Sequence, residues 1–136
     1  MRIYLDACCL LRPLDDQAQH RIRVESEAVC VILELCGKGL HRWISSETVE
    51  NEVLRDPDVD RRGIVAGMLR FADERLLADD RSIAGATVVS TVLPSFDALL
   101  TTDDELLRRA GRVRPPLRLK VANPARWVLE EAVDGA

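Results

Sequence analysis

Two acidic residues follow short apolar runs at opposite ends of the chain, in positions typical of a catalytic or metal-binding edge. Asp6 follows residues 2–5, and Asp103 follows residues 99–102, where leucines and β-branched threonines indicate a buried strand. Ligand sites in α/β sheets lie outside the carboxyl ends of the strands. The simplest role for Asp103 is to cap the helix that begins at Asp104, and a site at the sheet edge is the alternative.

The chemistry that suits these two acids is the binding of a divalent cation. If both strands are central and parallel, Asp6 and Asp103 meet at one edge of the sheet. Asp6 precedes the apolar residues 7–11, which should be buried, and a carboxylate beside them is costly without a partner or a metal. No matching buried cation is evident in the sequence. Because Mg²⁺ and Mn²⁺ prefer oxygen ligands, the pair indicates one of these ions.

Alternating strands and helices are expected to position these acids. Apolar residues at helical spacing predict a long helix over 17–36, which Gly37 and Gly39 end. Ser46 is a good N-cap for a helix over 47–54. Further strands are expected at 41–44, 76–78 and 117–121, and further helices at 58–71, 81–92, 104–110 and 125–133. The alternation predicts one α/β domain over residues 1–136, with a mainly parallel central sheet flanked by helices.

Composition and cysteine usage indicate a protein of a reducing compartment. The chain is 47% apolar and 31% charged, and no apolar run is long enough to span a membrane. Its first residues look like a strand and not like a signal peptide, so we expect a cytoplasmic protein. Cys8, Cys9, Cys30 and Cys36 lack CxxC spacing, and we expect buried thiols instead of a zinc site.

Charge is distributed unevenly along the chain. The net charge of −4 argues against a protein that simply coats nucleic acid. Residues 108–120, however, hold six basic residues and no acid. This segment is therefore a candidate for phosphate contacts, with a solvated basic face or a patch for an acidic partner as the alternatives.

Several motifs together resemble one known family. Residues 1–10, MRIYLDACCL, resemble the opening of a PIN domain, and RPLDDQ at 12–17 resembles one bacterial subgroup of that family. SSETVENE at 45–52 resembles the second motif of the family, FDAL at 96–99 its third and LTTDD at 100–104 its fourth. NPARW at 123–127 resembles the ending of the subgroup. The resemblance covers most of the chain, and the first and fourth motifs are its most specific parts.

The resemblance implies both an activity and a set of site residues. PIN domains are Mg²⁺- or Mn²⁺-dependent ribonucleases, and many are VapC-type toxins of toxin–antitoxin pairs. By this resemblance Asp6, Glu52, Asp97 and Asp103 would surround the metal, RNA would be the substrate and an antitoxin protein a partner. In such a site the acids hold the cation, the cation holds the scissile phosphate, and a metal-bound water attacks it.

The chain departs from the family between its third and fourth motifs. Asp97 and Asp103 are only six positions apart, where the family has a helix and a turn between the two acids. In one extended strand they would lie about 20 Å apart, too far to share a metal. Three interpretations remain open. Residues 97–100 form a turn that brings Asp97 to the site, or Asp79 or Asp80 takes the place of Asp97, or the third acid is absent. Motif identity favours Asp97, and the order of elements favours Asp80.

Three functions fit the sequence. The leading one is a metal-dependent endoribonuclease of the VapC toxin type. The second is a catalytically impaired PIN-like module that acts by binding a protein such as an antitoxin. The short segment between the third and fourth motifs favours this second function. The third is a phosphoacceptor domain that resembles receiver domains, with Asp6 as acceptor. It fits the acids at the strand ends, but the acceptor aspartate expected at the end of a middle strand is lacking. Apolar residues on the helices at 17–36 and 58–71 exceed what a small sheet covers, so we also expect a symmetric homodimer.

Overall fold

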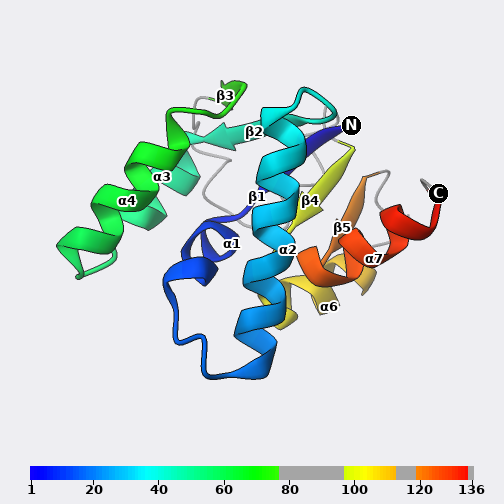
Figure 1. The fold of residues 1–136 in the computed structure, drawn as a ribbon, viewed down its shortest axis with the longest axis horizontal. Helices are drawn as coiled ribbons and strands as arrows, with labels where there is room; N and C mark the ends of the chain where they lie inside the picture. The colour runs from blue at the N-terminus through cyan, green and yellow to red at the C-terminus, as the bar shows by residue number, and fades with distance from the viewer. Residues whose placement is uncertain (77–96, 113–118, 135–136) are drawn as a thin grey trace.

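The core of the fold is a parallel β-sheet with helices packed on it. The computed structural model describes residues 1–76, 97–112 and 119–134. Within these ranges five parallel strands form one sheet in the order β3-β2-β1-β4-β5, so that β1 is central (Figure 1). The strands are β1 Arg2–Leu5, β2 Arg42–Ser46, β3 Glu74–Leu76, β4 Ala98–Leu100 and β5 Lys120–Ala122. The expected α/β class with a mainly parallel sheet is confirmed.

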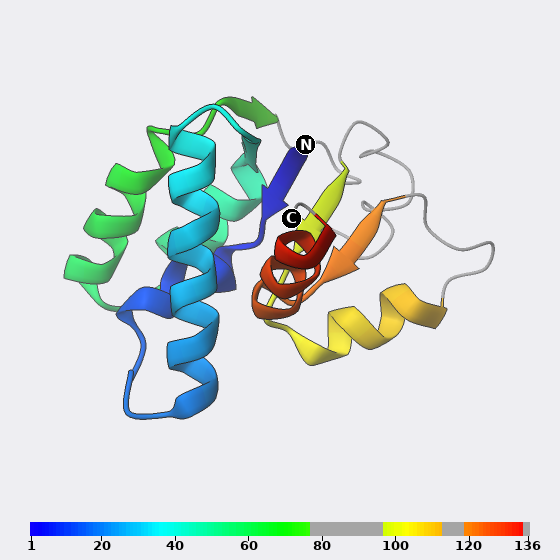
Figure 2. The same ribbon diagram turned by 45° about the vertical axis from the view of Figure 1, so that its right-hand side comes forward.

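Helices connect and cover the strands. The short helix α1 and the 3₁₀ turn η1 lead into α2, and α7 lies beside α2 over the sheet (Figures 1 and 2). The bounds are α1 Ala7–Leu11, η1 Arg12–Leu14, α2 His20–Gly37, α3 Glu47–Leu54, α4 Val59–Leu69, α6 Asp104–Arg112 and α7 Pro124–Asp134. None of the helices in the described ranges is long and apolar enough to cross a membrane.

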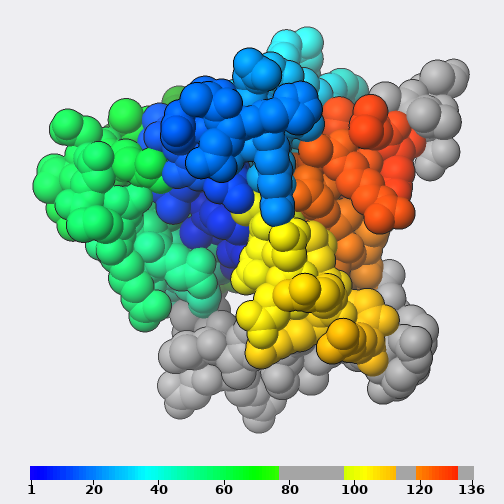
Figure 3. Space-filling view, turned by 90° about the horizontal axis from the view of Figure 1, so that it is seen from below, coloured from blue at the N-terminus to red at the C-terminus, as the bar shows by residue number. Residues whose placement is uncertain are grey.

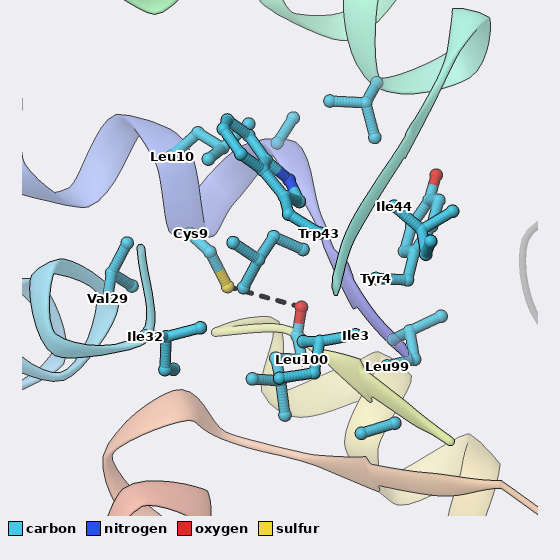
Figure 4. Packing of buried hydrophobic residues seen from close by; sticks show 14 of the residues in the cluster. Ile3, Tyr4, Cys9, Leu10, Val29, Ile32, Trp43, Ile44, Leu99 and Leu100 are labelled. Carbon is cyan, nitrogen blue, oxygen red and sulfur yellow. Dashed lines mark hydrogen bonds between the residues drawn. The ribbon is translucent and has the colours of Figure 1, made fainter. Parts of the chain in front are cut away.

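The hydrophobic core follows from the alternation of side chains along the strands. Ile3, Trp43 and Leu100 face α1 and α2, where they meet residues such as Cys9 and Ile32 (Figure 4). The Sγ of Cys9 donates a hydrogen bond to the carbonyl oxygen of Leu100, 3.3 Å away, and so joins α1 to the end of β4. Tyr4, Ile44 and Leu99 are buried on the opposite side of the sheet. Both faces of the central strands are therefore covered, as in other parallel sheets.

A buried ionic cluster fixes α2 against its neighbours. The side chain of Glu25 is only 3% exposed and pairs with Arg12 at 3.0 Å and with Arg21 at 3.2 Å. The amide of Asn123, just before α7, also donates to Glu25. Arg21 in addition donates to the carbonyl oxygen of Thr102, 3.0 Å away. One carboxylate thus joins η1, α2, α7 and the loop after β4.

Several expected boundaries differ from those in the structure. β4 ends at Leu100, so Thr101 and Thr102 lie in the loop that follows it. β3 begins two residues before the predicted strand at 76–78, and β5 begins at Lys120, where 117 was expected. The predicted helix at 81–92 lies outside the described residues. Among the cysteines, Cys9 and Cys36 are buried as expected, but Cys8 is half-buried and Cys30 is exposed on α2.

Candidate active site at the carboxyl edge of the sheet

Asp6 stands at the carboxyl end of the central strand, where the chain turns from β1 into α1. Its extended backbone makes it the N-cap of α1, and its Oδ1 accepts a hydrogen bond from the backbone N–H of Ala7 at 2.9 Å. Its own N–H donates to the carbonyl oxygen of Leu100 on β4. The structure therefore places Asp6 between the ends of β1 and β4, as the sequence predicted.

Thr101 links Asp6 to the loop that carries Asp103. The side chain of Thr101 is fully buried, and its Oγ1 donates to Oδ2 of Asp6 at 2.9 Å. The same oxygen accepts a hydrogen bond from the backbone N–H of Asp103 at 3.1 Å. A hydroxyl has one proton to donate, so the bond to Asp6 fixes its orientation. Asp6 and Asp103 are thus held to the same side-chain oxygen.

Asp103 performs the helix-capping role that was its simplest interpretation. Its Oδ1 accepts from the backbone N–H groups of Glu105 and Leu106, at 2.9 and 3.3 Å, at the start of α6. The residue is exposed to solvent. Both capping contacts use Oδ1, so the cap does not engage the second oxygen of this carboxylate.

Glu52 approaches the same edge from α3. Ser46 caps this helix by accepting from the N–H of Val49, and it shares a hydrogen bond of 2.7 Å with the hydroxyl of Tyr4. Desolvation and then the negative charge of Asp6 raise the pKa of Glu52, with Arg55 opposing them. Burial raises the pKa of Tyr4 to about 12, and the charges of Asp6 and Glu52 add to this effect. The side chains of Tyr4, Asp6 and Glu52 therefore share one electrostatic environment.

Asp97 does not join this group. It immediately precedes β4, and β4 runs parallel to β1 with Ala98 opposite Ile3, so Asp97 lies at the amino edge of the sheet. Its Oδ2 accepts from the backbone N–H of Arg2 at 2.7 Å, at the start of β1. The chain extends between Asp97 and Asp103 and does not turn, which separates the two acids. The structure thus does not bring Asp97 to Asp6, Glu52 and Asp103, contrary to what the motif resemblance implied.

The remaining expectations concern the metal site itself. Asp79 and Asp80, the alternatives to Asp97, lie outside the described residues. Among the residues that are described, no three His, Cys, Asp or Glu side chains are arranged to hold a metal ion. The two acids at strand ends and Glu52 are of the right donor type for a hard cation, but a complete ligand set is not formed by them alone.

Figure 3 views the molecule from the side where the strands end. The beginning of α1 and the loop after it (dark blue) lie between the α3–α4 hairpin (green) and α6 (yellow). The elements that carry Glu52, Asp6 and Asp103 therefore follow one another across this face. An elongated substrate laid over it would meet all three elements.

Tyr4 and Cys8 also belong to this edge, and the sequence did not identify them. Cys8 is the second residue of α1, with its Sγ 3.6 Å from Oδ2 of Asp6 and 3.4 Å from Oγ1 of Thr101. The backbone N–H of Thr102 donates to this sulfur at 3.4 Å. The signal that could have identified such residues is their position in the sequence. Cys8 lies two residues after Asp6, and Thr101 lies two residues before Asp103.

Comparisons of the chain with known protein families, with characterised proteins and with solved structures find no match. The resemblance to PIN domains therefore depends on the motif residues alone.

Proposed function

We propose that this chain is a metal-dependent endoribonuclease of the PIN, VapC-toxin type, whose cation is held by Asp6 and Glu52 with Asp103 beside them. The observation that supports the proposal is the attachment of Asp6 and Asp103 to one buried hydroxyl, that of Thr101. A helix cap needs only contacts to its own helix, so this shared hydroxyl is a further constraint that holds the carboxylate of Asp6 and the backbone of Asp103 together.

The oxygen donors at this edge suit Mg²⁺ or Mn²⁺. When bound, such a cation polarises a phosphodiester and makes a water molecule nucleophilic at neutral pH. The protein itself supplies the orientation, since Thr101 fixes Asp6 while the cap holds Asp103. Arg108 and Arg112 are exposed on α6, the helix that begins at this site, and are positioned to contact RNA phosphates.

The test uses the purified chain, a fluorescently labelled single-stranded RNA and millimolar Mg²⁺ or Mn²⁺. We expect the cation to raise the melting temperature, because a ligand that binds only the folded state stabilises it, and to permit RNA cleavage. Asp6→Asn removes one charge with little change of shape and should abolish both effects. Asp97→Asn, at the opposite edge of the sheet, should leave both effects in place. Cleavage that survives Asp6→Asn would contradict the proposal.

A second candidate function is a catalytically impaired PIN-like module that acts by binding a protein of the antitoxin kind. The observation that favours it is the position of Asp97, which leaves three acids at the carboxyl edge within the described ranges. In this case neither cation shifts the melting temperature. Asp6→Asn then raises it, because the change removes the repulsion between Asp6 and Glu52. The rise in melting temperature caused by the cation, and its loss in Asp6→Asn, therefore separate the two functions.

A further inference from the structure

One side chain of α2 holds the start of α6. Arg21, the second residue of α2, donates from Nη1 and Nη2 to the two carboxylate oxygens of Asp104, at 2.8 and 2.9 Å. Its Nη2 also donates to the carbonyl oxygen of Thr102, 3.0 Å away. Asp103 lies between these two residues in the chain. One guanidinium group therefore binds the residue on each side of Asp103.

The guanidinium group of Arg21 is itself held by a buried carboxylate. Its Nε donates to Glu25 at 3.2 Å, and the side chain of Glu25 is buried on α2. Arg12 and the amide of Asn123 bind the same carboxylate, so its position is fixed from two further elements. Figure 3 shows the N-terminal part of α2 (blue) against α6 (yellow). Arg21 thus connects a fixed anchor in α2 to the loop after β4.

The helix α6 depends on such polar contacts more than the other helices do. Among residues 104–112 none is buried, and Leu106 is only partly buried against the core. Burial of an apolar face is what mainly fixes a helix in a protein, so this source of order is weak here. The cap formed by Asp103 attaches that residue to α6 itself. The bonds from Thr101 and Arg21 attach the loop and the start of α6 to the rest of the fold.

The geometry of these contacts requires an arginine. A guanidinium group presents its N–H donors in one rigid plane, and Arg21 uses Nε, Nη1 and Nη2 for its three partners. A lysine ammonium group has no such fork and cannot bind all three at once. The side chains of Arg21 and Asp104 are 51% and 59% exposed, and so exposed a pair contributes little to the free energy of unfolding. We therefore expect its main effect on the position of the loop.

We propose that Arg21 is a positioning residue of the candidate active site, which fixes Asp103 at the carboxyl edge of the sheet by binding the residues on both sides of it. The inference rests on the proposed function, because it assigns Arg21 a role at the same carboxylates. Asp6 and Glu52 belong to elements that bury apolar side chains, whereas Asp103 stands in the short loop between β4 and α6. Its position is therefore the one that most needs a second residue to hold it.

The test compares two substitutions that keep the charge. Arg21→Lys retains a cation beside Glu25 and removes the fork, so it changes geometry and not charge. Arg23→Lys makes the same change at an exposed position of α2, two residues later. We expect Arg21→Lys to need about tenfold more Mn²⁺ than Arg23→Lys for half of the rise in melting temperature. For RNA cleavage, kcat should fall by a similar factor while KM changes little, because the charge that attracts RNA is kept.

Amide hydrogen exchange without any cation separates this inference from the proposed function. The backbone N–H groups of Asp103, Glu105 and Leu106 should exchange faster in Arg21→Lys than in Arg23→Lys, while the urea midpoints of the two variants stay alike. If the original chain shows neither a cation response nor cleavage, the proposed function fails, and exchange still decides whether Arg21 holds Asp103. Equal exchange rates in the two variants would overturn the inference. Equal Mn²⁺ requirements in the two variants of a chain that binds the cation would overturn it as well.

Discussion

Thr101 shows how one side chain can organise a whole edge. Its buried oxygen donates to Asp6 and accepts from the N–H of Asp103. Thr101→Val keeps the shape and removes both bonds. We therefore expect unfolding in urea to show a loss of about 1–2 kcal/mol. The stabilisation by Mg²⁺ or Mn²⁺ should be lost as well.

Thr101→Ser is the matched control, because it retains the hydroxyl and removes only a methyl group. It should recover the cation-induced rise in melting temperature, even if the smaller side chain costs some stability through a cavity. A Thr101→Val protein that responds to the cation as the original does would show that the shared hydroxyl does not orient Asp6 and Asp103.

Tyr4 provides a direct measure of the charges at the site, because it is the only tyrosine in the chain. Burial, with the charges of Asp6 and Glu52, raises its pKa from 10.0 to about 12. Absorbance of the phenolate should therefore appear near pH 12, and Glu52→Gln should move this transition to lower pH. A transition that stays at its position in Glu52→Gln would place Glu52 away from Tyr4.

The raised pKa of Tyr4 also determines the sign of a stability change. The folded protein holds the phenolic proton more tightly than the unfolded chain does, so this stabilisation is complete below pH 10 and is lost as the pH rises through 12. We expect a loss of about 2–3 kcal/mol over this window, which Tyr4→Phe should not show. Urea unfolding at several pH values measures the difference.

At the scale of the elements, the cluster around Glu25 determines how α2 packs. Glu25→Gln leaves Arg12 and Arg21 without a buried counter-charge while it keeps the shape of the side chain. Breaking a fully buried pair costs about 3–5 kcal/mol, but both arginines keep part of their solvent, so we expect about 2–3 kcal/mol from urea unfolding. Glu34→Gln, at an exposed pair with Lys38 on the same helix, should cost about 0.5 kcal/mol or less.

The loop after β4 should respond to the same substitution. Arg21 donates to the carbonyl oxygen of Thr102 and to Asp104, and Glu25 holds the Nε of Arg21. Faster amide hydrogen exchange at residues 102–104 in Glu25→Gln than in Glu34→Gln would support this connection. Equal exchange in the two variants would show that the cluster affects only the packing of α2 and α7 and not the loop after β4.

The elements that the sequence predicted best are those with a strong local signal. The helix α3 was expected at its observed bounds because Ser46 caps it, and the long α2 was recognised from its apolar spacing. The three-residue strands β3 and β5 were misplaced by two to three residues, since such short segments carry too little pattern to fix their ends.

The candidate site was partly predictable for a different reason. Asp6 and Asp103 follow strands, and a parallel sheet brings strand ends together, so their proximity follows from the fold class. Asp97 was assigned by motif identity, but whether it lies at the amino or the carboxyl edge depends on where β4 begins. Pairing between distant strands decides this, and the local sequence does not contain that information.

At the scale of the whole molecule, three large apolar side chains are exposed on the outer surface of α2 and α7. Val24 and Val31 on α2 are about two-fifths exposed, and Leu129 on α7, which lines the same shallow depression as Val24, is 69% exposed. A patch that spans two neighbouring helices can pair with its own copy about a two-fold axis. We place the expected homodimer interface on this surface, which includes α2 but, of the two helices that the sequence indicated, not α4.

Light scattering on the protein at micromolar concentration should give twice the chain mass of 15.2 kDa. Val31→Glu together with Leu129→Glu places four like charges within a symmetric interface and should yield a monomer. Leu54→Glu introduces the same charge at an exposed position on α3, away from α2 and α7, so it should leave the dimer intact. A chain that is monomeric at this concentration, or a dimer that Leu54→Glu dissociates, would exclude the α2–α7 surface as the interface.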